Sequence, residues 1–230
     1  MSLIHGEGFQ VTVVRSSRRR TVVLQIRDGQ AVIRMPAHMP LAQAEQFVQQ
    51  KKTWIKHHLA ASPPPVSQQF RSGETLLFHG RPVTLTIHSA QSRNAVSLQA
   101  DQLQLLCRDA APQSAQLKQQ LSRWLRQQAQ AYLSERTQQL VSHTGLQPTQ
   151  LTIRSYTARW GSCKTNGSIQ LNWKLIMAPP SVSDYVIIHE LCHLRHHNHS
   201  PAFWQLVAQF DPNFKQHRDW LKRHGQQLNI

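Results

Sequence analysis

The residues best suited to chemistry lie in a histidine-rich stretch, which holds five of the 14 histidines of the sequence between positions 189 and 199. Three residues separate His189 from His193, and Glu190 follows the first of them. On an α-helix the two histidines lie one turn apart on the same face, where both imidazoles can bind one metal ion. Glu190 lies about 100° further round the helix, beside the ion, where its carboxylate can take a proton from a metal-bound water. The spacing therefore predicts a zinc site with a general base.

A catalytic zinc site takes three protein ligands and keeps one position open for water. No glutamate follows Glu190 in the sequence, so the third ligand is not a downstream glutamate. His199 is favoured, because Ser200-Pro201 predicts the start of the next helix and places His199 in a tight turn that can fold back towards the ion. His196 shares the helix face but lies about 10 Å along the axis from His189. The alternatives that remain open are His196, Asp211 and His217.

A β-hairpin is expected just before this helix. Asn166-Gly167 separates two strand-like runs, which is the strongest short-range hairpin signal. The second run, residues 168–177, alternates apolar with polar residues, and we expect it to be an edge strand that holds an extended peptide by strand addition. The side chains proposed to contact substrate are those of its polar face: Gln170, Asn172 and Lys174. Ser181 and Asp184 then predict a capping-box start of the metal-binding helix.

The rest of the chain mixes strands and helices. Residues 9–36 are rich in β-branched runs, and a helical apolar period begins at Leu41 and includes Trp54. Three consecutive prolines predict a linker over residues 62–66. A long helix is expected from Pro112 to about His143, with Gly145 as its C-terminal stop. Short strands are expected before it, near residues 76–80, 83–88, 95–100 and 103–107.

These elements predict an α+β fold with two regions. Residues 1–110 form an N-terminal β-rich region with one helix. Residues 111–230 form a long connecting helix and a catalytic region, which contains the hairpin and the metal-binding helix. No repeat of the kind that builds solenoids is visible in the sequence.

Composition bears on location and partners. The 230 residues include 26 Lys and Arg against 11 Asp and Glu, which gives a net charge of +15. No apolar run approaches the roughly 20 residues of a membrane span, no secretory signal is visible, and three distant cysteines do not suggest a disulfide framework. We therefore expect a cytoplasmic protein without a membrane partner. The densest basic segment is a turn that contains Arg15, Arg18, Arg19 and Arg20. This turn is predicted either to bind a nucleotide or nucleic acid or to be a solvated hairpin tip without a partner.

The last third of the sequence also resembles a known family. The segments ARWGSC, GSIQLNWKLIMAP and DYVIIHELCHLRHHNHSPAFW are similar to those of the YgjP-type minimal zinc metallopeptidases, relatives of the SprT-like and WLM proteases, and the similarity runs from about Tyr156 to Trp220. The resemblance implies a gluzincin-like minimal fold with Glu190 as the base. The zinc ligands that it implies are His189, His193 and His199.

One motif of the resemblance, Trp160-Gly161-Ser162-Cys163, precedes the hairpin turn and allows two interpretations. The first is a packed strand with a bulge at the glycine. The second is that Cys163 lies near the zinc and binds it in a latent state. Cys192, inside the metal-binding helix, is expected to be a small buried residue, and Cys107 an ordinary strand residue of the core.

The function predicted from these residues is zinc-dependent hydrolysis of peptide bonds, with Glu190 as general base. The alternative enzyme would hydrolyse a phosphoanhydride such as a nucleoside triphosphate, although a Gly-rich phosphate loop and carboxylate clusters for Mg²⁺ are not evident. A nucleic-acid-associated protease is a further alternative. A nucleic-acid-binding protein with structural zinc is disfavoured, because such sites close all four positions, usually with cysteines.

Overall fold

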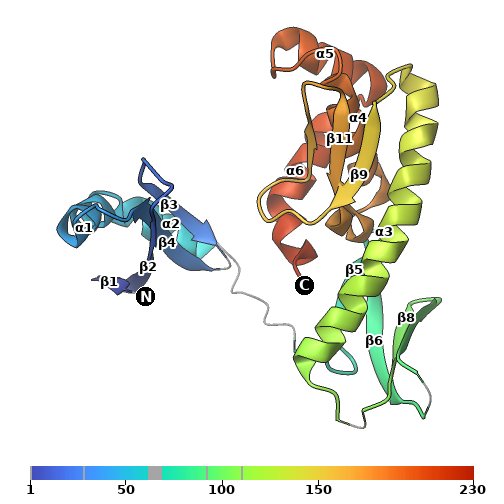
Figure 1. Cartoon of the computed structure of the whole chain (residues 1–230), viewed down its shortest axis with the longest axis horizontal. Coiled ribbons are helices and arrows are strands. Elements are labelled where there is room, and N and C mark those ends of the chain that lie inside the picture. Colours follow the sequence, from blue (N-terminus) through green and yellow to red (C-terminus); the bar gives the residue numbers. More distant parts are fainter. Residues whose placement is uncertain (1, 28, 62–68, 92, 110) are drawn as a thin grey trace. The chain divides into compact units, whose positions relative to one another are not determined.

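Figure 1 shows the computed structural model of the chain, which describes residues 2–27, 29–61, 69–91, 93–109 and 111–230. The chain folds as two compact units, Met1–Ser67 and Gln68–Ile230, and each has its own hydrophobic core. Both units combine sheets with helices, which confirms the predicted α+β class. The predicted linker at residues 62–66 lies outside the described residues.

The N-terminal unit is a four-stranded sheet packed against two helices. Its strand order is β1-β2-β4-β3, in which β2 and β4 are parallel and the outer pairs are antiparallel. The helix predicted from Leu41 is broken at Lys51 into α1 and α2; Ile55 keeps its predicted place in the core, whereas Trp54 is 38% exposed. The elements are β1 (Ser2–Gly6), β2 (Phe9–Ser16), β3 (Val23–Arg27), β4 (Gln30–Pro36), α1 (Leu41–Gln50) and α2 (Lys52–Ala61).

The C-terminal unit begins with a second four-stranded sheet, which repeats the topology of the first. Its strands are β5 (Thr75–Phe78), β6 (Arg81–Ser89), β7 (Ala95–Gln99) and β8 (Gln102–Cys107). The order is β5-β6-β8-β7, again with a parallel central pair between two antiparallel pairs. The registers of the first hairpins also correspond. Ile4 pairs with Val11 in the first sheet, and the residues 72 positions later, Leu76 and Val83, pair with each other in the second. The same offset relates the β3–β4 register to that of β7 and β8.

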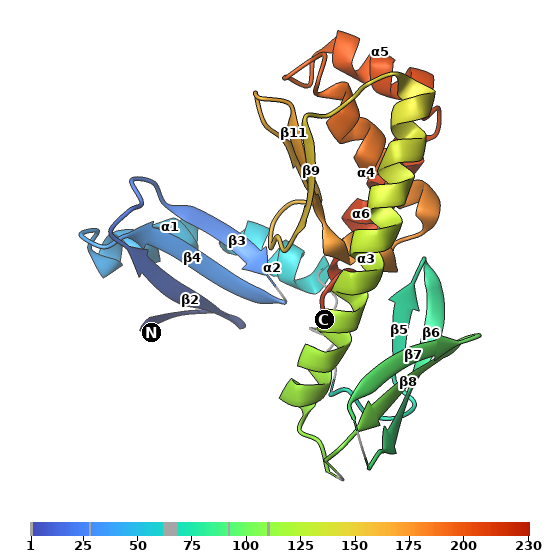
Figure 2. The same cartoon turned by 45° about the vertical axis from the view of Figure 1, so that its right-hand side comes forward.

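A single long helix, α3 (Ser114–Thr144), connects this sheet to the rest of the unit (Figure 2). It ends at Gly145 in the left-handed conformation, with a φ of 68°, as predicted. Leu117 and Leu121 on α3 belong to the same core as Leu103 and Leu105 on β8. Strands β5–β8 therefore belong to the same unit as α3, whereas the sequence predicted a division between residues 110 and 111. No helix in the described part of the chain is long and apolar enough to cross a membrane.

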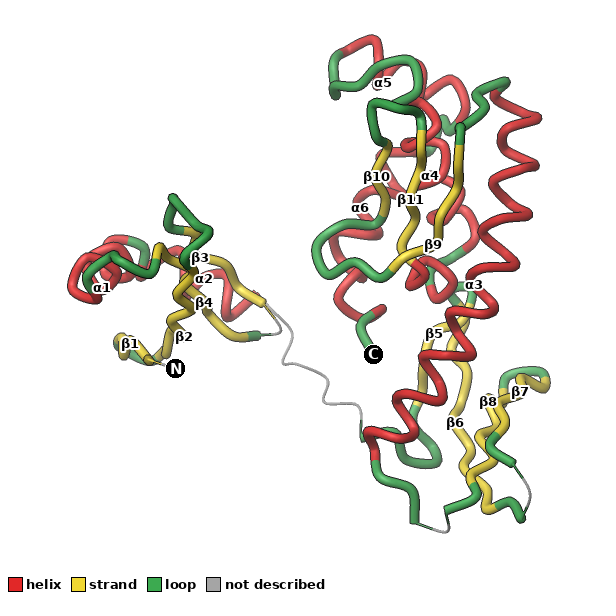
Figure 3. Tube along the Cα trace, viewed as in Figure 1, coloured by secondary structure: helices red, strands yellow, loops and turns green. Residues whose placement is uncertain are grey.

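The remainder of the unit holds a three-stranded sheet of order β10-β11-β9, visible in Figure 3, with helices that follow it. The antiparallel pairing of β10 with β11 confirms the hairpin at Asn166-Gly167, and Gly167 supplies the positive φ of 79° that the turn requires. The elements are β9 (Gln150–Arg154), β10 (Gly161–Cys163), β11 (Ser168–Asn172), η1 (Trp173–Met177), α4 (Pro180–Cys192), α5 (Pro201–Phe210), α6 (Phe214–His224) and η2 (Gly225–Leu228).

The predicted edge strand at 168–177 is wrong in two respects. It ends at Asn172, whose side-chain oxygen accepts a hydrogen bond from the Lys174 backbone and starts a 3-10 helix, η1. It is also the central strand of its sheet, because β9 pairs with it in parallel on the side away from β10. The short-range pattern could not reveal this parallel neighbour, since parallel strands are joined by long connections rather than tight turns.

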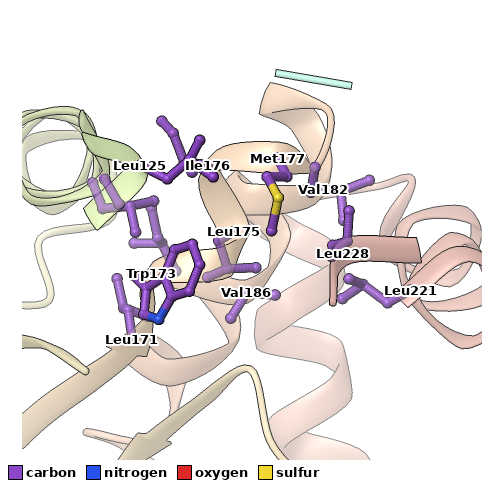
Figure 4. Close-up of a cluster of buried hydrophobic side chains, with 14 of the residues drawn as sticks. Leu125, Leu171, Trp173, Leu175, Ile176, Met177, Val182, Val186, Leu221 and Leu228 are labelled. Carbon is purple, nitrogen blue, oxygen red and sulfur yellow. The ribbon is translucent and has the colours of Figure 1, made fainter. Parts of the chain in front are cut away.

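Buried side chains from η1 form the centre of this region, as Figure 4 shows. Trp173, Leu175, Ile176 and Met177 are all at most 3% exposed, so the alternation of the sequence does not correspond to two faces here. Their neighbours in the cluster come from several elements: Leu125 on α3, Val182 and Val186 on α4, Leu221 on α6 and Leu228 on η2. The 3-10 helix therefore packs directly against α4, the helix that carries His189.

The two separate cores predict that damage to one spares the other. Ile33 is fully buried in the N-terminal core. We expect Ile33→Ala to lower the free energy of unfolding of the N-terminal unit by about 2–5 kcal/mol, because it leaves a cavity. Amide protection in α3 and α4 should not change. Hydrogen exchange followed by mass spectrometry of peptides from both units measures both effects, and reduced protection in α4 would contradict the division.

Candidate metal centre

Helix α4 positions the first two histidines. It begins at Pro180, with Pro179 as the N-cap residue, so the predicted capping box of Ser181 and Asp184 is wrong. Asp184 instead binds Arg136 on α3 through two hydrogen bonds, Nε to Oδ1 at 2.7 Å and Nη2 to Oδ2 at 2.8 Å. A bidentate pair of this kind fixes the rotation of one helix against the other.

The helical segment ends at Cys192, but the spacing that the motif needs is kept. The backbone N–H of His193 donates to the carbonyl oxygen of His189 at 3.3 Å, so the two side chains remain one turn apart. Their ring centroids are 4.9 Å apart. His189 is the more buried of the two, and His193 lies at the edge where the chain leaves the helix.

His199 comes to the same point from the turn before α5. Ser200 is the N-cap residue of α5 and Pro201 is its first residue, as predicted; the Ser200 hydroxyl accepts from the Phe203 N–H at 3.4 Å. The Nε2 atoms of His199 and His189 are 3.1 Å apart. One nitrogen from each of the three histidines lies within 4.8 Å of the other two. The structure thus brings together the three histidines that the sequence favoured.

The rings are oriented by their surroundings. His193 Nδ1 lies 2.9 Å from the carbonyl oxygen of His196, which leaves Nε2 of His193 free to face the other histidines. Phe203 stacks on His193 with centroids 4.4 Å apart, and Trp204 stacks on His199 at 5.6 Å. Burial lowers the pKa of His189 to about 3, and His193 and His199 add to this effect; burial likewise lowers the pKa of His193. Both imidazoles are therefore neutral near pH 7, the form that binds metal.

The alternative third ligands are engaged elsewhere. Asp211 Oδ2 lies 2.8 Å from Nδ1 of His217, and Asp211 Oδ1 accepts from the Asn213 N–H. His196 contributes its backbone carbonyl rather than its ring to the surroundings of His193. Among the described residues, none of these three side chains belongs to the cluster of potential ligands.

Glu190 is buried next to the first histidine and faces the backbone of β10. Its pKa is raised to about 8 by burial, against the opposing effects of Arg159 and of the Cys163 backbone N–H, which donates to the carboxylate. This close approach requires a glycine at 161. A Cβ there would lie 2.5 Å from Oε1 of Glu190. Gly161 pairs regularly with Leu171, so the predicted bulge is wrong, and its role is to let a strand lie against the carboxylate.

The cysteines differ in their surroundings. Cys163 is half-buried, its thiol lies 3.5 Å from the carbonyl oxygen of Lys164, and burial and the charge of Glu190 raise its pKa. It does not belong to the cluster of potential ligands among the described residues, and its role in a latent state stays a prediction. Cys192 and Cys107 are buried, as expected, and burial raises the pKa of Cys192 to about 12.

The three residues predicted to contact substrate form hydrogen bonds with other parts of the chain, and one of them is buried. Gln170 accepts a hydrogen bond from the Tyr156 hydroxyl. Asn172 is 2% exposed and donates to the carbonyl oxygens of Tyr156 and Arg159. Lys174 donates to the side chain of Asn229. A contact of these three with substrate stays a prediction, and the strand addition proposed for it would need an open edge that β11 lacks.

The basic turn lies in the N-terminal unit. Arg15 is engaged by its own loop, because Nη1 donates to the carbonyl oxygens of Ala37 and Met39 at 2.8 and 2.7 Å. Arg18 and Arg20 are exposed and Arg19 is half-buried. A nucleotide or nucleic-acid partner for this turn stays a prediction.

Sequence reasoning missed the cleft beside the histidines, which has a volume of about 360 Å³. It lies between α4, the start of β10 and α6, and His189 and Glu190 form part of its wall. Arg218 and Lys222 on α6 also line it, and neither was among the predicted site residues. Their spacing of four residues, which places both on one helical face, was the available signal.

An α+β unit in which three imidazoles meet beside a buried carboxylate is typical of metal-dependent hydrolases. The comparisons specify the family: the YgjP-like metallopeptidase domain matches residues 20–224, and the chain belongs to this family of metallopeptidases.

Among solved structures, the metallopeptidase zymogen abylysin of Pyrococcus abyssi is similar at 24% identity and a TM-score of 0.35. That similarity covers 38% of this chain and 89% of the abylysin chain. No curated protein matches the chain.

The family implies a divalent metal, and the three histidines fit one. Two nitrogens bound to a tetrahedral zinc at about 2.0 Å are roughly 3.3 Å apart. The 3.1 Å between the Nε2 atoms of His189 and His199 is close to this value. The donor set consists of imidazole nitrogens, which bind transition-metal ions, whereas Mg²⁺ and Ca²⁺ prefer oxygen ligands.

Gly161→Ala is expected to displace the Glu190 carboxylate while the histidines keep their places. A shift of about 1 Å in a catalytic group can reduce turnover about 100-fold, and we expect a loss of at least this size with unchanged metal content. Peptidase assays and metal analysis of the purified variant measure the two quantities. Ser162→Ala is the matched control, since Ser162 points away from Glu190 towards the Tyr156 hydroxyl, 3.3 Å away. Equal activity of both variants would contradict this account.

Proposed function

We propose that the protein is a zinc metallopeptidase with a gluzincin-like catalytic unit, in which His189, His193 and His199 hold the ion and Glu190 transfers the proton. The observation that carries this proposal is the convergence of three histidine nitrogens within 4.8 Å of one another, next to a buried glutamate. No fourth histidine, cysteine or carboxylate joins the cluster in the described part of the chain. A three-ligand set of this kind is typical of catalytic rather than structural zinc.

A bound zinc ion would supply Lewis acidity, which lowers the pKa of water and polarises the peptide carbonyl. The remaining steps belong to the chain itself. Glu190 accepts the proton of the attacking water and passes it to the leaving amine. The backbone N–H of Cys163 holds its carboxylate in place, and Gly161 provides the space for it.

Burial raises the pKa of Glu190 in the protein alone, whereas a divalent cation next to it would favour the charged form. The two influences bring the carboxyl group towards the range in which a general base works best near neutral pH. Val186, one turn before Glu190 on the same helix, is buried and contributes apolar surface beside the carboxylate.

The assignment of the third ligand predicts the result of metal analysis. His199→Ala should weaken zinc binding by more than about 100-fold, since even residues that only orient a ligand contribute 10–100-fold. Asp211→Ala and His217→Ala are the controls and should retain zinc, because these side chains bind each other instead. Competition with a chelator of known affinity measures all three variants. Retention of zinc by His199→Ala with loss in either control would identify a different third ligand.

The role of Glu190 is tested by Glu190→Gln, which keeps the shape of the side chain and removes its basicity. We expect zinc content to be unchanged and kcat for peptide hydrolysis to fall by about 10²–10⁴-fold. Turnover and zinc stoichiometry are measured on the same preparation. Undiminished hydrolysis would exclude Glu190 as the base, and loss of zinc would show that it is a ligand.

A further inference from the structure

The cleft beside the metal centre combines apolar walls with a basic rim. Trp160, Val186 and Leu221 contribute the apolar surface, and Arg218 and Lys222 contribute the charge. Because His189 and Glu190 belong to the same cleft, a group bound there lies next to the proposed scissile bond. A volume of about 360 Å³ is at the small end of the range for ligand pockets and suits one or two amino-acid residues.

Arg218 is held in position by aromatic contacts. Its guanidinium carbon lies 5.4 Å from the ring centroid of Trp204, which is a cation–π contact. Trp204 in turn stacks on His199 with an interplanar angle of 24°. The side chain is therefore tied to the metal centre through one intervening ring. Lys222 follows one turn later on α6 and lines the same cleft.

These two cations form no ion pair in the part of the chain that the structure describes. Within the described residues, neither Arg218 nor Lys222 has a carboxylate oxygen within 4.0 Å. The nearby Asp211 is occupied by His217 and by the Asn213 N–H. Among the described residues that line the cleft, Glu190 is the only acidic one, and the proposed mechanism already uses it. Two unmatched cations beside apolar walls are the complement of an anionic group attached to an apolar one.

We propose that this cleft binds a carboxylate of the substrate peptide, either the side chain of an acidic residue or the C-terminal carboxylate, together with an adjacent apolar side chain. This inference rests on the proposed metallopeptidase function and names its substrate class. Arg218 provides the planar donor pair that matches a carboxylate, and Lys222 adds a second charge. The apolar wall favours an amino-acid residue over a nucleotide. A triphosphate group would require hydrogen-bond donors on all sides of its phosphates.

The first measurement uses the zinc-loaded full chain and matched peptides. In one arm, Asp replaces Asn at each position in turn; in the other, each peptide is prepared with a free C-terminal acid and as the amide. We expect one arm to show a preference for the charged peptide of about 10- to 100-fold in kcat/KM, because a charge-assisted hydrogen bond contributes about 1.5–3 kcal/mol. The arm that shows the preference identifies the source of the carboxylate.

The second measurement asks whether the cleft causes the preference. In the double variant Arg218→Gln with Lys222→Gln, the ratio of kcat/KM between charged and neutral peptides should fall to within about threefold of one. The control is Lys215→Gln with Arg223→Gln, which removes the same charge from exposed positions of the same helix outside the cleft. Lys222→Gln alone keeps the stacking of Arg218 on Trp204 and should give an intermediate ratio.

Peptide binding provides a readout that does not depend on turnover. In the Glu190→Gln background, the dissociation constant of the preferred peptide should rise about tenfold with Lys222→Gln and should not change with the control pair. Zinc content is measured for every variant. Hydrolysis of peptides without any charge preference, or a preference that the double variant keeps, would overturn the carboxylate site and leave the peptidase intact. Hydrolysis of nucleoside triphosphates with no peptide cleaved would overturn both proposals.

Discussion

Helix α4 is buried on nearly every side, and this burial constrains everything around it. It packs against η1 and α3 on one side and against β10, α5 and α6 on the others. Each of these neighbours determines one property of the site. α3 fixes its rotation through the pair of Arg136 and Asp184, the turn before α5 brings His199, and β10 brings a backbone N–H to Glu190. If α5 did not pack against α4, His189 and His193 would keep their spacing but His199 would not lie beside them.

The same burial determines the charge state of the site. Imidazoles in an apolar environment lose their protons, and a carboxyl group in the same environment keeps its own. In this protein both effects occur on consecutive residues, His189 and Glu190. A cation bound by the histidines would thus compensate for the burial of the glutamate. Histidine and glutamate side chains are common in proteins. Their shifted pKa values here result from the apolar packing of Val186, Ile187 and Leu191 around them.

The sequence predicted best where information is local. The spacing of His189 and His193, the start of α5 at Ser200-Pro201 and the glycine stop of α3 each follow from a few neighbouring residues. The errors occur where distant segments decide. Asp184 looked like a capping residue because its partner, Arg136, lies 48 positions earlier. Residues 173–177 were predicted to be strand because their apolar residues fall at every second position. A short 3-10 helix that is buried all round has apolar residues at these positions too. The cleft could not be predicted because it forms between α4 and α6, and no sequence motif indicates that these two helices pack together.

The duplicated sheet topology has a consequence for how the chain reaches its native state. Strands β1–β4 and β5–β8 offer equivalent hairpins with the same registers, so backbone hydrogen bonding alone does not prevent a hairpin of one sheet from joining the other. Two features distinguish the correct assemblies. The central parallel pairs differ by two residues, since Val13 pairs with Ile33 whereas Leu85 pairs with Leu103. Synthesis also completes α1 and α2 before β5 exists, so the first sheet can close before its competitor leaves the ribosome.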